Sequence, residues 1–172
     1  MTISDVFVYA EFFALLCAVG AASACIAACC ADRYKGDKKR LFVSCFLISV
    51  AMTAAIVCFF GLSSYALKGI ILCLILLYAS YSDIKSRECD DFIHVMILIA
   101  AFIGIRTDML PDMILAAMFV FSVMLLAILV SKSNIGGADL KLSVACAFML
   151  GSRQGIFGFV LSLVIAVAVN LI

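Results

Sequence analysis

The feature that most constrains the fold of this chain is a succession of apolar stretches, several of them close to the length that spans a lipid bilayer. The stretches lie at residues 5–31, 41–60, 65–82, 92–105, 112–130, 139–151 and 155–172. A helix needs about 20 apolar residues to cross the hydrocarbon core of a bilayer, whereas a membrane β-barrel uses shorter segments of alternating polarity. The pattern therefore predicts an all-α, polytopic transmembrane helical bundle of about six to seven membrane segments. Some stretches are short for a span, especially 139–151, so tilting, partial spans and fusion of the last two stretches around Gly151 and Gly155 are left open.

Composition agrees with a membrane environment and argues against other classes of protein. The chain has 172 residues, of which 67% are apolar and 13% charged, against about 45–50% and about 25% in soluble domains. We expect one transmembrane domain over residues 1–172, with the lipid bilayer as a partner and no separate soluble domain. The formal net charge of +1 gives no support for nucleic-acid binding.

The cysteines do not indicate a disulfide framework or a metal site. The chain has 9 of them, an odd number, and nearly all are scattered through the apolar stretches. Cys25, Cys29 and Cys30 are clustered, but no histidine or carboxylate lies beside them to complete a zinc site. We interpret the cysteines as small apolar packing residues.

The distribution of Lys and Arg predicts the orientation in the membrane. One set of alternate loops holds nine basic residues: Arg33, Lys35, Lys38, Lys39, Arg40, Lys85, Arg87, Lys132 and Lys141. The opposite set holds three: Lys68, Arg106 and Arg153. The positive-inside rule therefore places the first set in the cytoplasm and the N-terminus outside. The N-terminal stretch "MTISDVFVYAEFF" has acidic but no basic residues, so we interpret it as a retained first span and not as a cleaved signal.

This orientation brings two acidic segments to the cytoplasmic face of the membrane. They are "YSDIKSRECDD" at 81–91 and "SKSNIGGAD" at 131–139, and two apolar stretches separate them. Asp83 closes one apolar stretch and Asp139 opens another, so we expect their carboxylates to face each other. Two carboxylates a few ångströms apart share one proton. The ionised member can then take a proton from water while the protonated member polarises a peptide carbonyl, as in aspartic proteases.

The residues before Asp139 are small, which suits close approach of a substrate backbone. Gly136 and Gly137 permit unusual backbone angles and leave no side chain in the path of an extended substrate, and Ala138 is also small. We therefore expect all three to contact substrate. A purely structural interpretation stands beside this one, because Asp is a favoured helix N-cap and Gly-Gly commonly precedes a helix.

The two motifs together resemble a known family. "YSDIKSR" at the end of one apolar run and "GGADLKL" at the start of another are similar to the type IV prepilin peptidases, membrane aspartyl proteases of the GxGD class. The resemblance implies that Asp83 and Asp139 are the first and second catalytic aspartates. In overall size the chain resembles the short branch that serves Flp/Tad-type pili, which lacks a large cytoplasmic zinc-binding domain. It departs from the family at Ala138, where the third position of GxGD is Gly, and at Cys89-Asp90, where Ile-Pro is frequent.

The resemblance also implies a substrate and a location. Prepilins are membrane proteins with a short basic leader followed by an apolar helix, and they would be cut at the cytoplasmic surface of the cytoplasmic membrane. No metal or organic cofactor is needed, because two carboxylates and water suffice. N-methylation of the new terminus, known in longer relatives, is left open, as is the oligomeric state.

Two alternative functions remain open at this point. One is a small ion-coupled transporter subunit that uses the two acids as a relay, although such acids usually lie near the bilayer midplane. The other is a different GxGD protease that cuts signal-peptide remnants or other membrane segments.

Several charged residues near the two aspartates have a functional and a structural interpretation. Lys85, Arg87 and Lys141 could steer substrate or bias the dyad, but membrane anchoring also explains them. Glu88, Asp90 and Asp91 could attract a basic leader or simply form a solvated loop. His94, one turn into an apolar stretch, is interpreted as an interfacial or hydrogen-bonded core residue.

Overall fold

The structure is a computed structural model, and it describes residues 3–34, 38–86, 90–105, 107–131 and 136–170. These residues form α-helices, one short 3₁₀ helix and the connections between them, with no strand in any of the described ranges. The predicted all-α class is confirmed. Clustering of contacts divides the chain into two compact units, Met1–Glu88 and Cys89–Ile172, and each is described by itself below.

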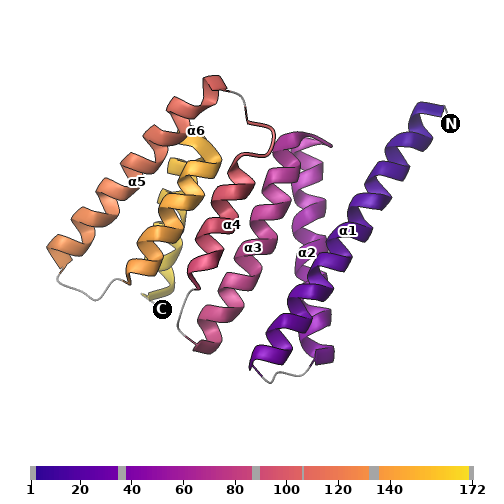
Figure 1. Cartoon of the computed structure of the whole chain (residues 1–172), viewed down its shortest axis with the longest axis horizontal. Helices are drawn as coiled ribbons and strands as arrows, with labels where there is room; N and C mark the ends of the chain where they lie inside the picture. Colours follow the sequence, from indigo (N-terminus) through magenta and orange to yellow (C-terminus); the bar gives the residue numbers. More distant parts are fainter. Residues whose placement is uncertain (1–2, 35–37, 87–89, 106, 132–135, 171–172) are drawn as a thin grey trace. The chain divides into compact units, whose positions relative to one another are not determined.

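The first unit contains three long helices, α1 (Ile3–Tyr34), α2 (Lys38–Phe60) and α3 (Ser64–Ser86), each of which contacts the other two (Figure 1). Two buried hydroxyl groups in α2 bond to the backbone of their own helix. The buried hydroxyls of Ser49 and Thr53 both donate to the carbonyl four residues earlier, each at 2.7 Å. Such bonds are the usual way to bury a hydroxyl in an apolar helix.

The second unit contains α4 (Asp91–Ala101), the 3₁₀ helix η1 (Thr107–Met109), α5 (Leu110–Ser131) and α6 (Gly137–Asn170). Helix α6 contacts both α4 and α5 (Figure 1). Small residues allow α5 and α6 to pack closely, since Ala116 and Ala147 are buried beside Val120, Met124 and Phe159 in one cluster. This packing holds the first turn of α6, where Asp139 lies.

Helix α6 reverses direction at Gly151, which has φ 78° and ψ 177°. A Cβ placed on Gly155 would lie 2.9 Å from the carbonyl oxygen of Ala147, whereas residues eight positions apart in a straight helix are separated by about 12 Å. The element is therefore a hairpin of two helical arms, residues 137–150 and 152–170, and Figure 1 shows the second arm returning beside the first. The arms correspond to the two apolar stretches predicted at 139–151 and 155–172.

A carboxylate from α5 caps the second arm of the hairpin. Asp112 accepts a hydrogen bond from the backbone N–H of Ser152 at 2.9 Å and a second one from the Ser152 hydroxyl. Free N–H groups and the positive end of the helix dipole favour a carboxylate at this place. The cap ties the turn at Gly151 to the start of α5.

Replacement of Gly151 by alanine is expected to destabilise the second unit. The backbone at this position lies in a region that essentially only glycine adopts, and a Cβ would lie 2.7 Å from Oδ2 of Asp112. We expect Gly151→Ala to lower the free energy of unfolding by about 1–3 kcal/mol, measured by thermal unfolding in detergent. Gly158→Ala is the matched control, because a Cβ there meets nothing within 4 Å. Equal stability of the two variants would contradict the strained turn.

The number of membrane spans is lower than the six to seven predicted. Four helical segments of the described chain are long and apolar enough to cross a membrane: Lys39–Phe60, Ser64–Ser86, Thr107–Val130 and Gly137–Val169. Two further apolar segments, Ala14–Cys30 and Asp91–Ala101, are shorter. The prediction was too high because α4 ends at Ala101, which gives it a length of about 17 Å, and because the first arm of the α6 hairpin is only about 21 Å long. Both are shorter than the hydrocarbon core of about 30 Å.

Candidate active site

Asp139 lies in the first turn of α6, which begins at Gly137. The carbonyl oxygen of Gly136 accepts hydrogen bonds from the backbone N–H groups of Asp139 at 3.1 Å and of Leu140 at 3.5 Å. Gly136 therefore occupies the cap position, and the interpretation of Asp139 as the N-cap residue is wrong. A carboxylate in the first turn still interacts favourably with the helix dipole, so Asp139 also suits the stability of the helix.

The described residues leave room for a side chain at both glycines. A Cβ on Gly136 would lie 3.6 Å from Oδ2 of Asp139, an ordinary contact, and a Cβ on Gly137 would meet nothing within 4 Å. Neither residue has a positive φ; the described glycines that do are Gly61, Gly104 and Gly151. The expectation of unusual backbone angles at these two positions is therefore not met, and what they contribute is an unobstructed surface.

Asp139 itself is exposed, and its carboxylate makes no hydrogen bond or ion pair with any residue in the described part of the chain. Ala138, next to it, is half-buried. Gly136, Gly137 and Ala138, the three predicted substrate contacts, directly precede this exposed carboxylate in the sequence, and their contact with substrate stays a prediction.

Asp83 lies in the last turn of α3, in the first unit, and its side chain is exposed. It follows directly on the buried Ser82, so the helix turns from its packed face to its open face at this point. Lys85, two residues later, is also exposed. Because Asp83 and Asp139 belong to different units, their pairing as a dyad stays a prediction. Arg87, Glu88, Cys89 and Lys132, which entered the sequence interpretation, lie outside the described residues.

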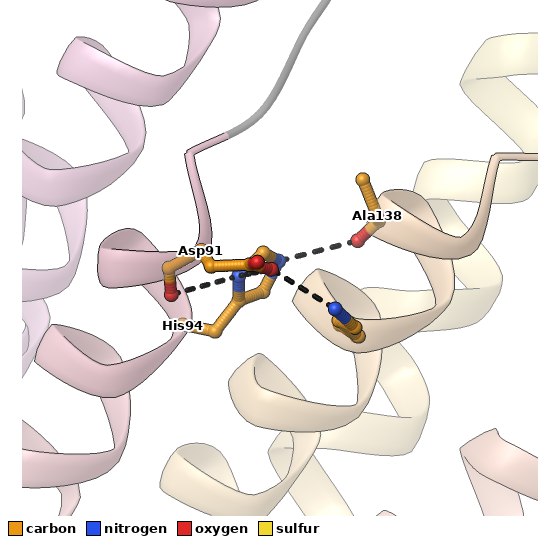
Figure 2. A network of polar contacts seen from close by, with 4 residues as sticks. Asp91, His94 and Ala138 are labelled. Carbon is orange, nitrogen blue, oxygen red and sulfur yellow. Dashed lines mark hydrogen bonds and ion pairs between the residues drawn. The ribbon is translucent and has the colours of Figure 1, made fainter.

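A polar network joins the first turns of α4 and α6 beside Asp139 (Figure 2). His94 is buried, with its Nε2 atom 3.3 Å from the carbonyl oxygen of Ala138 and its Nδ1 atom 3.2 Å from that of Asp91. The sequence interpretation of His94 as a hydrogen-bonded core residue is confirmed. Its contact with the residue before Asp139 was not predicted, because the two are far apart in the sequence.

Lys141 completes the network from the second turn of α6. Its ammonium group donates a hydrogen bond of 2.9 Å to Oδ1 of Asp91. This hydrogen bond and the positive charge of Lys141 hold the pKa of the exposed Asp91 carboxyl below its usual value. Lys141 thus has a partner on α4, which weakens the interpretation that Lys141 steers substrate. The ion pair of Lys141 and Asp91 also carries little net charge, which weakens the interpretation that Asp91 attracts a basic leader.

The network also places the ends of the two acidic segments at the same end of the second unit. Asp91 closes the segment 81–91, and Ala138 and Asp139 close the segment 131–139. The helices α4 and α5 lie between them in the sequence, so the chain leaves this end of the unit and returns to it. Only Asp91 of the segment 81–91 takes part in this contact, so the placement of both segments at the cytoplasmic face stays a prediction.

Residues 70–171, more than half of the chain, match the type IV leader peptidase family. The chain belongs to this family. Among curated proteins no match is found, and among solved structures none is found either.

Membership of this family shows that the chain is a protease of the general type IV leader peptidase kind. It also confirms the family resemblance seen in the sequence. The matched region contains Asp83 and Asp139, together with His94. The apolar helices and the family together indicate a multi-pass membrane protein. Within the described ranges, no group of three or more His, Cys, Asp or Glu side chains is gathered in a way that could hold a metal ion.

Proposed function

We propose that the protein is an aspartyl endopeptidase that removes the leader from prepilin-type precursors of the Flp/Tad kind, at the cytoplasmic face of the cytoplasmic membrane. In this proposal Asp83 and Asp139 form the catalytic dyad, and Gly136, Gly137 and Ala138 line the path of the substrate. The observation that carries the proposal is that the leader peptidase match spans both aspartates.

The surroundings of Asp139 support a chemical role for this residue. Its carboxylate is exposed, makes no hydrogen bond or ion pair with any described residue, and lies beside Gly136, where an added Cβ would be 3.6 Å from Oδ2. A structural carboxylate in the same unit is different: Asp112 uses both oxygens to cap a helix. The contrast favours Asp139 as the reactive acid of this unit.

The proposed reaction needs only the two carboxylates and water. The ionised carboxylate takes a proton from a water molecule, whose oxygen attacks the carbonyl carbon at the leader junction. The protonated carboxyl gives its proton to the carbonyl oxygen, and a tetrahedral diol forms. When the diol collapses, the C–N bond breaks and a proton passes to the leaving amine, so that the leader gains a carboxyl end and the mature protein an amino end.

Co-expression with a candidate prepilin tests the proposed activity. We expect the prepilin to become shorter by the length of its leader in membranes that contain the chain, and to stay at full length when expressed alone. The measurement is the mass of the purified prepilin, which also locates the cut. A prepilin that stays uncut, with both proteins present in the same membrane at normal levels, would contradict the proposal for that class of substrate.

A further inference from the structure

We propose that His94 is a positioning residue for Asp139, acting through a hydrogen bond from its Nε2 atom to the carbonyl oxygen of Ala138. The inference rests on the proposed catalytic role of Asp139 and adds a residue to the site from a different helix. Figure 2 shows the ring of His94, on α4, directed at the first turn of α6.

The contact acts on the peptide unit that leads into Asp139. The Ala138 carbonyl belongs to the same rigid peptide plane as the N–H of Asp139, and that N–H donates to Gly136 at 3.1 Å. The Nε2 atom of His94 lies 3.3 Å from the Ala138 oxygen. It therefore restrains this peptide plane at the edge opposite to the bond with Gly136. A carbonyl oxygen has two lone pairs, so this bond can coexist with the bond inside the helix.

The restraint matters because the other described contacts near the start of α6, the packing of Leu140 on the core cluster and the bond from Lys141 to Asp91, come after Asp139 and not at the glycines. A Cβ on Gly137 would meet nothing within 4 Å, so the first turn lacks packing there. His94, in contrast, is buried, and its helix α4 packs on α6 and carries the buried Ile93 and Ile97. In this proposal the packed helix α4 holds the first turn of α6, whose glycine side stays open for substrate. Supporting residues on rigid helices usually keep reactive groups in place in this way.

The chemistry of the imidazole ring defines what the bond requires. Both ring nitrogens of His94 face carbonyl oxygens, at 3.2 Å and 3.3 Å, and a carbonyl only accepts hydrogen bonds. A neutral ring carries one N–H and can satisfy one of the two carbonyls; a protonated ring satisfies both. Positioning of Asp139 requires the proton on Nε2, whereas the Nδ1 contact stays within α4 because its acceptor is Asp91.

Two amide substitutions separate these contacts. In His94→Gln the amide nitrogen is as many bonds from Cα as Nε2 is, so it can still donate to Ala138. In His94→Asn the amide nitrogen corresponds to Nδ1, so the contact within α4 is kept and the contact with Ala138 is lost. Both variants place a neutral amide in the same site, so they are matched controls for each other.

We expect His94→Asn to lower kcat for prepilin cleavage by about tenfold to a hundredfold, with KM little changed, because a poorly placed acid slows the reaction more than it weakens binding. His94→Gln should recover most of the lost rate. Both variants should show similar thermal unfolding in detergent. Equal kcat for parent and His94→Asn, or no difference between the Asn and Gln variants, would overturn the proposal.

Hydrogen exchange of the purified protein gives a second readout that does not depend on cleavage. Peptides covering residues 136–143 should exchange faster in His94→Asn than in the parent, and His94→Gln should resemble the parent. Unchanged exchange in His94→Asn would overturn the positioning role even if cleavage were seen. Failure of the parent to cleave any prepilin, with the exchange pattern as expected, would count against the proposed function and leave the link between His94 and the first turn of α6 intact.

Discussion

Asp83→Asn and Asp139→Asn are each expected to abolish cleavage of a co-expressed prepilin, with a loss of rate of about a thousandfold or more. Asparagine has nearly the size of aspartate and can make many of its hydrogen bonds, so each variant should insert and fold like the parent. An amide, however, can neither take a proton from water nor share one with a second carboxylate. The measurement is the fraction of prepilin shortened at equal membrane levels of each variant.

Asp108→Asn is a matched control for these two variants, because Asp108 lies in η1, just before α5. The start of α5 contacts the turn at Gly151, at the opposite end of the first arm of α6 from Asp139. This variant makes the same chemical change and should leave processing close to the parental rate. If Asp139→Asn processes prepilin as well as Asp108→Asn does, Asp139 has only the structural value of a carboxylate at a helix N-terminus.

Gly137→Val is expected to reduce cleavage by about tenfold or more while leaving the protein in the membrane at its normal level. A side chain at Gly137 would enter space that no described residue occupies within 4 Å, so the fold does not need this glycine. In the proposed path over Gly136, Gly137 and Ala138, a substrate backbone would meet the branched side chain. Cleavage rate and thermal unfolding in detergent, measured together, separate these two effects.

The control for Gly137→Val is the same substitution at Gly158, the other glycine of α6 with nothing within 4 Å of its Cβ position. Gly158 lies in the second arm of the hairpin, well past the first turn. Valine there should change neither cleavage nor stability appreciably, since it has a somewhat better helix propensity than glycine. Parental cleavage by Gly137→Val would show that the glycines serve only as an entry to the helix.

Much of the fold could be predicted from hydropathy, because a bilayer leaves little choice of backbone structure. A backbone in hydrocarbon must satisfy its own hydrogen bonds, so long apolar stretches are read as helices with few alternatives. The length of each stretch was a poorer guide. Residues 92–105 suggested a span, yet α4 ends at Ala101, because apolar character alone does not distinguish the last helical turn from the loop that follows.

The hairpin in α6 shows a second limit of sequence patterns. Gly151 and Gly155 marked a break between two apolar stretches, and the structure has a reversal there. Which glycine turns the chain depends on φ and on the neighbours of each: Gly151 has φ 78° beside the Asp112 carboxylate, and Gly155 packs against the Ala147 backbone. Contacts between residues distant in sequence decide this, and hydropathy does not record them.

For the candidate site, the residue types indicated where the site lies. The structural role of each residue was predicted less well. Asp139 was singled out correctly as lying at the start of a helix, but the cap is Gly136. The glycines were expected to provide backbone freedom and instead provide open space. His94 gave one signal that could have been used: a single histidine in an apolar stretch needs a polar partner, and here it finds the backbone of Ala138.

The most direct test of the central claim compares Asp83→Asn, Asp139→Asn and the double variant as purified proteins acting on a prepilin. Residues that act as one catalytic unit give strongly non-additive losses. We therefore predict that each single variant loses essentially all of the cleavage rate and that the double variant is hardly slower than either. A double variant whose loss is the product of two moderate losses, or a single variant that cleaves at close to the parental rate, would contradict a catalytic dyad of Asp83 and Asp139.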